Sequence, residues 1–386
     1  MPLYDLNEFF KLSSALNYNL SAESLNRYNV LMYIIGRKRL HAEDAKDKEY
    51  KSIIMEALSC LFNAYQKKKR RLGPMAVLHP LRATALLVRA LDDLTITDLL
   101  ASLFHDILED VRTTDFEKKK WRDLEIQFSS IFERLSPDDE QNLIYRLVQI
   151  TKRDNESYYH YIGRLLDAQN QLVELVQTKL ADRLDNTLDM RIDLQDPLEG
   201  VDFYQNLFQI LFVNNYKGYH PDGYHPPPAA ISGERRLFQL FKNAVLASLI
   251  RQKQDIENDK ASQTLFHALC EASLKEAQRN FVHVVGYHHT DLRSQRSLML
   301  EAMEYCYSGK SELVTRPDSE HLLDGLFTTY FGHTSRTIRE QKLDALYQNK
   351  PLMIQASIAF IVIFLSFLND PKFYVKGISA EGIQPR

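Results

Sequence analysis

The chain has 386 residues, 45% of them hydrophobic and 26% charged, which suits two globular domains and argues against a disordered protein. A formal net charge of −3 gives no overall attraction for nucleic acid or a membrane surface, so no nucleic-acid partner is expected. Three widely spaced cysteines argue against a disulfide framework, and the first residues lack the features of a secretory signal, so we expect a cytoplasmic protein.

Apolar residues recur at three- and four-residue spacing along most of the chain, whereas alternating runs of Val, Ile and Thr are nearly absent. This periodicity predicts an all-α protein. We expect an N-terminal helical extension over 1–48 and a first helical domain over 49–200. A linker or lid rich in Tyr, Gly, Pro and His follows over 201–233, and a second helical domain over 234–386.

A basic run at 67–71 precedes a histidine that is followed by proline, His79 and Pro80. The run is compatible with capture of a polyanionic nucleotide and equally with a solvated helix end. Proline favours the first turn of a helix, so His79 is expected where a helix begins. A single histidine in that position is also typical of a cap or a core residue.

The clearest amphipathic helix is predicted over 95–110. Thr95 and Asp98 resemble a capping pair at its start. Its apolar face is formed by Ile96, Leu99, Leu100, Leu103, Phe104, Ile107 and Leu108. This face is expected to pack in the core of the first domain.

Four residues of metal-ligand type end this predicted helix: His105, Asp106, Glu109 and Asp110. A rotation of 100° per residue puts them on one arc. No Lys or Arg lies between residues 90 and 111, so these carboxylates have no local cationic partner. A divalent metal ion is the simplest counterion if the helix is buried, and a solvated acidic face is the alternative.

A second helix is predicted from the spacing of Leu172, Leu175, Val176, Leu180, Leu184 and Leu188, and we expect it to pack near the first. Asp182 and Asn186 are four residues apart and share a face, and Lys179 lies one turn before Asp182. Read alone, these residues form an ordinary polar stripe. Together with His79, His105 and Asp106, Asp182 completes a set of four ligand-type residues from three segments.

The order of the motifs HP, HDxxED and KLADRLDN resembles the HD phosphohydrolase superfamily. Within it, the chain is most similar to the hydrolase domain of the RelA/SpoT-type enzymes of the stringent response. These remove the 3′-pyrophosphate from guanosine tetra- and pentaphosphate (ppGpp and pppGpp) with Mn²⁺. The resemblance covers residues 49–191 and implies an HD-type helical bundle followed by a second helical domain.

The resemblance also implies roles for individual residues. The metal ligands for Mn²⁺, or another divalent metal, would be His79, His105, Asp106 and Asp182. The pair that activates water would be Glu109 and Asp110. The residues that bind the nucleotide substrate would be Arg70, Arg71, Lys179 and Asn186.

Some positions differ from the alarmone-hydrolase pattern. Leu72, Pro74 and Met75 replace a serine and a Glu-Pro pair in the basic loop, and Asp185 replaces a histidine. Two alternatives therefore stay open beside alarmone hydrolysis. The first is an HD phosphohydrolase that acts on another nucleotide or phosphoester. The second is a non-catalytic nucleotide sensor.

One stretch near the C-terminus, 352–368, has no charged residue over 17 positions. As a helix it would be about 25 Å long, close to the lower limit for crossing a bilayer. A buried core helix and a membrane anchor are both compatible with this pattern. The sequence gives no prediction of oligomeric state.

Overall fold

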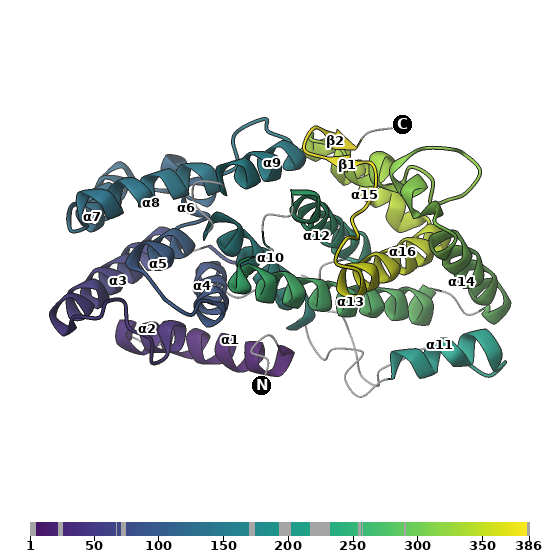
Figure 1. Cartoon of the computed structure of the whole chain (residues 1–386), viewed down its shortest axis with the longest axis horizontal. Helices are drawn as coiled ribbons and strands as arrows, with labels where there is room; N and C mark the ends of the chain where they lie inside the picture. Colours follow the sequence, from purple (N-terminus) through teal and green to yellow (C-terminus); the bar gives the residue numbers. More distant parts are fainter. Residues whose placement is uncertain are drawn as a thin grey trace. The chain divides into compact units, whose positions relative to one another are not determined.

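The computed structural model describes residues 5–21, 26–66, 68–70, 75–169, 174–192, 202–216, 232–253, 256, 258–288 and 291–383 (Figure 1). Helices make up nearly all the regular structure of these ranges. The only sheet within them is an antiparallel pair of two-residue strands, β1 Ile378–Ser379 and β2 Gly382–Ile383. The prediction of an all-α fold is confirmed.

The chain forms two compact units, and each unit is built from more than one stretch of sequence. Unit 1 comprises Met1–Arg153, Leu165–Leu188 and Ile256–Leu265, and unit 2 comprises Asp154–Arg164, Asp189–Asp255 and Phe266–Arg386. The four consecutive segments expected from the sequence stay a prediction. Most of the expected linker, residues 217–231, lies outside the described residues.

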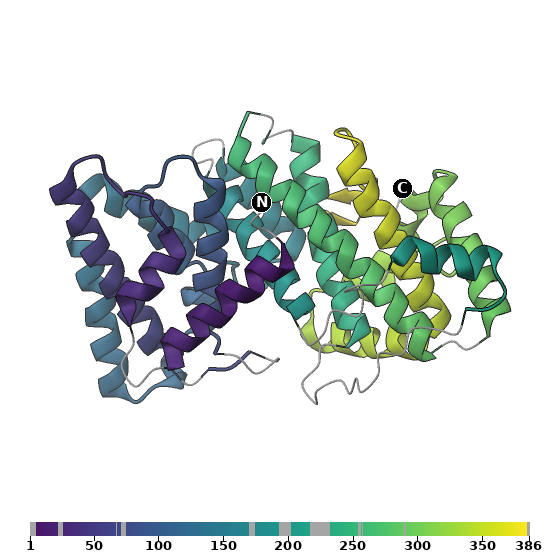
Figure 2. The same ribbon diagram turned by 90° about the horizontal axis from the view of Figure 1, so that it is seen from below.

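Unit 1 is built around a buried central helix, α4. Its elements are α1 Leu6–Ser21, α2 Arg27–Ile35, α3 Asp44–Tyr65, α4 Leu78–Ala90, α5 Ile96–Leu103, α6 Ile107–Asp110, η1 Thr113–Asp115, α7 Lys118–Glu133, α8 Pro137–Ile150 and most of α10 Glu174–Ile192. Helix α4 packs against α1, α2 and α5 (Figure 2), and α3 contacts α2, α5 and α7. Every residue from Leu78 to Val88 is buried, so α4 forms the core of the unit.

Helix α5 begins as predicted and ends earlier than predicted. Thr95 and Asp98 form a full capping box, in which each side chain accepts the backbone N–H of the other. The helix stops at Leu103, and α6 is a separate single turn. The Ser102 carbonyl accepts a hydrogen bond from the His105 side chain (2.7 Å). In the turn that follows, the Phe104 carbonyl accepts the backbone N–H of Ile107, three residues later and not four. His105 and Asp106 therefore lie in a turn between two helices and not on one continuous helical arc.

Unit 2 is also helical. Its elements are α11 Phe203–Phe212, α12 Gly233–Lys253, α14 Leu292–Tyr307, η2 Lys310–Thr315, η3 Phe327–Phe331, α15 Arg336–Gln348 and α16 Lys350–Asn369. Two further helices, α9 Tyr158–Gln169 and α13 Lys260–His288, have residues in both units. Helix α16 packs against α12, α14 and α15.

The apolar stretch predicted over 352–368 is helix α16. It is long and apolar enough to cross a membrane, and 78% of its most apolar 18-residue window is buried inside the structure. Its polar residue Ser357 is also buried. The Ser357 hydroxyl donates to the Met353 carbonyl (2.8 Å) and accepts from the Asn280 amide (3.1 Å). This packing favours a buried core helix. The membrane anchor stays an alternative prediction.

Candidate metal centre

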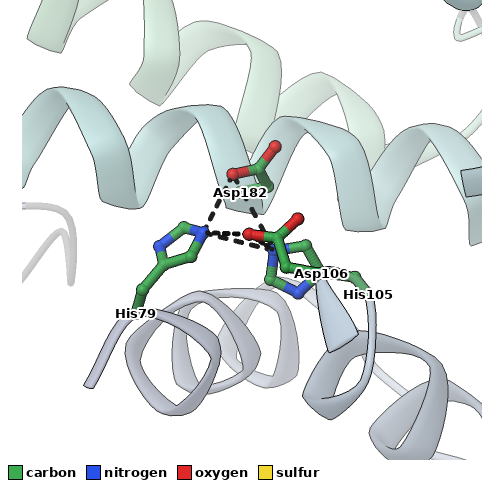
Figure 3. A group of neighbouring side chains, drawn as sticks. All are labelled: His79, His105, Asp106 and Asp182. Carbon is green, nitrogen blue, oxygen red and sulfur yellow. Dashed lines mark hydrogen bonds and ion pairs between the residues drawn. The ribbon is translucent and has the colours of Figure 1, made fainter. Parts of the chain in front are cut away.

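The four residues predicted as metal ligands converge on one point (Figure 3). One ligand atom from each of His79, His105, Asp106 and Asp182 lies within 4.8 Å of the other three. The His79 Nε2 atom is 3.1 Å from Asp182 Oδ1, 3.2 Å from Asp106 Oδ2 and 3.2 Å from His105 Nε2. Two ligand atoms that are each about 2.1 Å from one ion lie roughly 3 to 3.4 Å apart, so these separations suit a shared divalent cation.

Three separate segments supply these side chains. His79 is the second residue of α4, as predicted, and the turn after α5 supplies His105 and Asp106. Asp182 comes from the middle of α10. The side chains of His79, His105 and Asp182 are buried, and Asp106 is half-buried. The centre thus lies in the interior of unit 1, and Asp106 is its most exposed member.

The outer nitrogen of each imidazole has its own acceptor. His105 Nδ1 lies 2.7 Å from the Ser102 carbonyl oxygen, and His79 Nδ1 lies 2.6 Å from Asp185 Oδ2. Each Nδ1 therefore carries a proton that it donates, and the lone pair of a neutral ring is left on Nε2. Both Nε2 atoms face the two carboxylates. This donor set fits a divalent cation.

The charges of the four groups depend on one another. Burial acts to lower the pKa of His79 and of His105, but the neighbouring carboxylates outweigh burial and raise both values. Burial acts to raise the pKa of Asp106 and of Asp182, and nearby positive charge outweighs it and lowers both. The carboxylates are thus ionised and need positive charge beside them. A divalent cation can supply that charge in place of the imidazole protons.

Glu109 and Asp110, the predicted water-activating pair, lie on α6, directly after the ligand turn. Glu109 accepts the backbone N–H of Lys152 (2.6 Å), and Asp110 accepts the Tyr65 hydroxyl (3.1 Å). Both side chains reach the surface, yet the surrounding protein removes enough water to raise the pKa of each. The charge of Asp106 raises the pKa of both further. Carboxylates with raised pKa values are better proton acceptors than ordinary surface carboxylates.

Three of the four predicted substrate-binding residues lie beside the ligand Asp182. Lys179 Nζ is 2.7 Å from Asp182 Oδ2, and the Asn186 amide donates to Asp182 Oδ1 at 2.6 Å. Arg70 donates in turn to Asn186 Oδ1 at 2.7 Å. Arg71, the fourth predicted residue, lies outside the described residues. Substrate binding by the other three residues stays a prediction.

Sequence reasoning missed two residues of this site, Asp185 and Arg82. Asp185 is fully buried, and its carboxylate contacts His79, Arg82 and Arg70. Helical spacing carries the signal that would have identified them. Arg82 follows His79 by three residues on α4, and Asp185 follows Asp182 by three residues on α10, so each lies on the same helix face as a ligand.

No model of a known protein family matches this chain, and no curated protein matches its sequence. The resemblance to HD phosphohydrolases therefore stays a prediction, and it rests on the three motifs. The grouping of the four ligand residues is consistent with it.

Proposed function

We propose that this chain is a metal-dependent phosphohydrolase with one divalent ion held by His79, His105, Asp106 and Asp182. The observation that carries the proposal is the convergence of two imidazoles and two carboxylates from three segments. Such a mixed nitrogen and oxygen donor set suits Mn²⁺ and other divalent transition metals. We propose Mn²⁺ because the motif order resembles the RelA/SpoT-type hydrolases.

The residues around the centre suit hydrolysis of a phosphate ester or anhydride. An ion bound there would polarise a phosphoryl oxygen and lower the pKa of a bound water. Glu109 or Asp110, each with a raised pKa, would accept the proton that water loses as its oxygen bonds to phosphorus. The bond from phosphorus to the leaving oxygen breaks in the same reaction, and the leaving group departs with that oxygen and takes up a proton. The ammonium group of Lys179 provides positive charge for the phosphate oxygens of the substrate.

We propose a guanosine nucleotide with a 3′-pyrophosphate as the substrate, on the strength of the motif resemblance. A second candidate is another nucleotide or phosphoester. One observation favours it: the guanidinium group of Arg70 is paired with Asp185 and Asn186, and Asp185 stands where the alarmone hydrolases carry histidine. In the second candidate the chemistry at the metal centre is unchanged and only the recognition of the nucleoside differs.

Incubating the purified full chain with Mn²⁺ and guanosine tetraphosphate, and measuring pyrophosphate release, tests the proposal. We expect release that stops when the metal is chelated and in the His105→Ala variant. A panel of other nucleotides and phosphoesters in the same assay separates the two candidate substrates. Mn²⁺ and nucleotide binding with no turnover of any substrate would favour a nucleotide sensor instead, and absence of Mn²⁺ binding would overturn the metal centre.

A further inference from the structure

We infer that Asp185 is a positioning residue of the candidate metal centre: it fixes the ring of His79 so that Nε2 faces the ion. The inference deepens the proposed function and rests on it. Asp185 is not a ligand in the proposed set. It acts through His79, which it contacts on the side of the ring opposite the other ligands.

The contact between the two side chains is short and buried. Asp185 Oδ2 lies 2.6 Å from His79 Nδ1, and the exposed fractions of the two side chains are 0% and 9%. A carboxylate can only accept a hydrogen bond, so the shared proton belongs to Nδ1. This hydrogen bond sets the tautomer of His79 and the rotation of its ring at once.

Arg82 holds Asp185 in place. Its guanidinium group donates to both carboxylate oxygens, from Nε to Oδ1 at 2.8 Å and from Nη2 to Oδ2 at 3.2 Å. Arg82 is itself buried, and it lies over the ring of Phe9 at 5.0 Å. The carboxylate on α10 is thus fixed to α4, the helix that carries His79. A bidentate pair of this kind defines the position of a carboxylate better than a single hydrogen bond.

The two histidines of the centre are held by different acceptors. His105 donates to the neutral Ser102 carbonyl, whereas His79 donates to a charged carboxylate. A carboxylate behind a ligating histidine orients the ring and makes it a stronger electron donor, and losing such a partner costs roughly 10–100-fold in metal affinity. His105 therefore provides an internal control, because its acceptor does not change when Asp185 is replaced.

The first test compares Mn²⁺ affinity, measured from the electron paramagnetic resonance signal of free Mn²⁺, in wild-type protein and in Asp185→Asn. We expect the dissociation constant of Asp185→Asn to rise at least about tenfold. Asp98→Asn is the matched control. Asp98 is a buried carboxylate paired with an arginine, Arg146, at 2.6 Å, and its other hydrogen bonds go to Thr95. This control should bind Mn²⁺ as the wild type does.

A double variant tests the role without leaving the buried charge of Arg82 alone; Arg70, which also contacts Asp185, keeps its hydrogen bond to Asn186. Arg82→Met with Asp185→Leu replaces the ion pair by apolar side chains, which buried pairs often tolerate. We expect it to fold, as judged by its circular dichroism and cooperative unfolding, and to bind Mn²⁺ at least about tenfold more weakly. If Asp185→Asn fails to fold, this variant alone decides the question.

Proton resonances of the Co²⁺-loaded protein give a readout that a purely structural role would not change. The ring N–H protons of two ligating histidines are shifted far from other signals by the cobalt ion. Asp185→Asn should move the signal of His79 and leave that of His105 in place. The inference is overturned if wild-type protein binds Mn²⁺ and Asp185→Asn binds it equally well with both signals unmoved. Absence of binding by the wild type overturns the metal centre itself.

Discussion

Three of the four residues of the candidate centre have a partner outside it that helps to fix their geometry. His105 is fixed by a backbone carbonyl, His79 by Asp185, and Asp182 by Lys179 and Asn186. The ligand types were predictable, because HP, HDxxED and KLADRLDN each contain a metal-ligating residue. The pairing of His79 with Asp185 was not predictable. Spacing along α10 places Asp185 on the same face as Asp182, but it does not show which residue of α4 the carboxylate contacts.

Removing a ligand and removing the proton acceptor should have different effects. In His105→Ala the ion loses one of its four protein ligands, so Mn²⁺ binding should be lost. In Glu109→Gln the metal should stay bound, while turnover falls about 100-fold or more because water has lost its base. Electron paramagnetic resonance of free Mn²⁺ and pyrophosphate release measure the two effects. Equal loss of metal in both variants would contradict the role of Glu109.

Lys179 offers a test of substrate binding. Its ammonium group lies 2.7 Å from Asp182, next to the centre, and its side chain is only 12% exposed. A hydrogen bond from a charged donor is worth about 1.5–3 kcal/mol, so Lys179→Met should raise KM at least about tenfold. Lys260→Met is the control, because Lys260 forms a fully solvated pair with Asp92. An unchanged KM in Lys179→Met would remove Lys179 from the substrate site.

At the scale of elements, the sequence predicted where helices begin better than where they end. The start of α5 was visible because Thr95 and Asp98 form a local capping pattern, and the start of α4 was visible from Pro80. The end of α5 was missed because apolar periodicity continues through Ile107 and Leu108. Where the helix ends, the His105 side chain donates to the Ser102 carbonyl, a contact that periodicity does not predict.

The capping box of α5 should contribute measurably to stability. Thr95→Ala removes the acceptor for the backbone N–H of Asp98, and loss of such a cap costs about 1 kcal/mol of unfolding free energy. Thr95→Ser keeps the hydroxyl and should cost much less. Urea denaturation followed by circular dichroism measures the difference. If alanine and serine are equally stable at this position, the capping interaction contributes nothing.

Helix α16 provides a test between a core helix and a membrane anchor. Phe360 has an exposed fraction of 0%, and its ring packs against Phe327 at a centroid distance of 5.5 Å. In a core helix, Phe360→Ala should cost about 3–5 kcal/mol of unfolding free energy. Phe212→Ala, at a ring that is 69% exposed, should change stability by no more than about 0.5 kcal/mol. Equal, small effects in detergent-free protein would argue against the core role.

At the scale of the whole molecule, composition and periodicity were enough to predict an all-α chain. They were not enough to show that the two compact units interleave along the sequence, with unit 1 closing through Leu165–Leu188 and Ile256–Leu265. Interleaving depends on which helices pack together, and helices of similar amphipathic pattern give no indication of their partners. The linker over 201–233 could be predicted, because Gly and Pro indicate a loop from the local sequence alone.

Metal binding should stabilise the folded chain as a whole. A ligand that binds only the folded state adds about 2.7 kcal/mol when its concentration is a hundredfold above Kd. Adding Mn²⁺ should therefore raise Tm in a calorimetric scan, and a chelator should reverse the increase. His105→Ala should show no increase. A similar rise in that variant would place the stabilising metal at another site.

The wide spacing of the ligands along the chain has a consequence for biosynthesis. His79 is made early, whereas Asp182 follows 103 residues later (182 − 79 = 103). While the ribosome is still translating the segments between them, the nascent polypeptide holds at most three of the four donors. If the centre holds an ion as proposed, the complete set of four donors forms only after α10 has emerged, and a ribosome stalled before that helix would carry a chain with an incomplete centre.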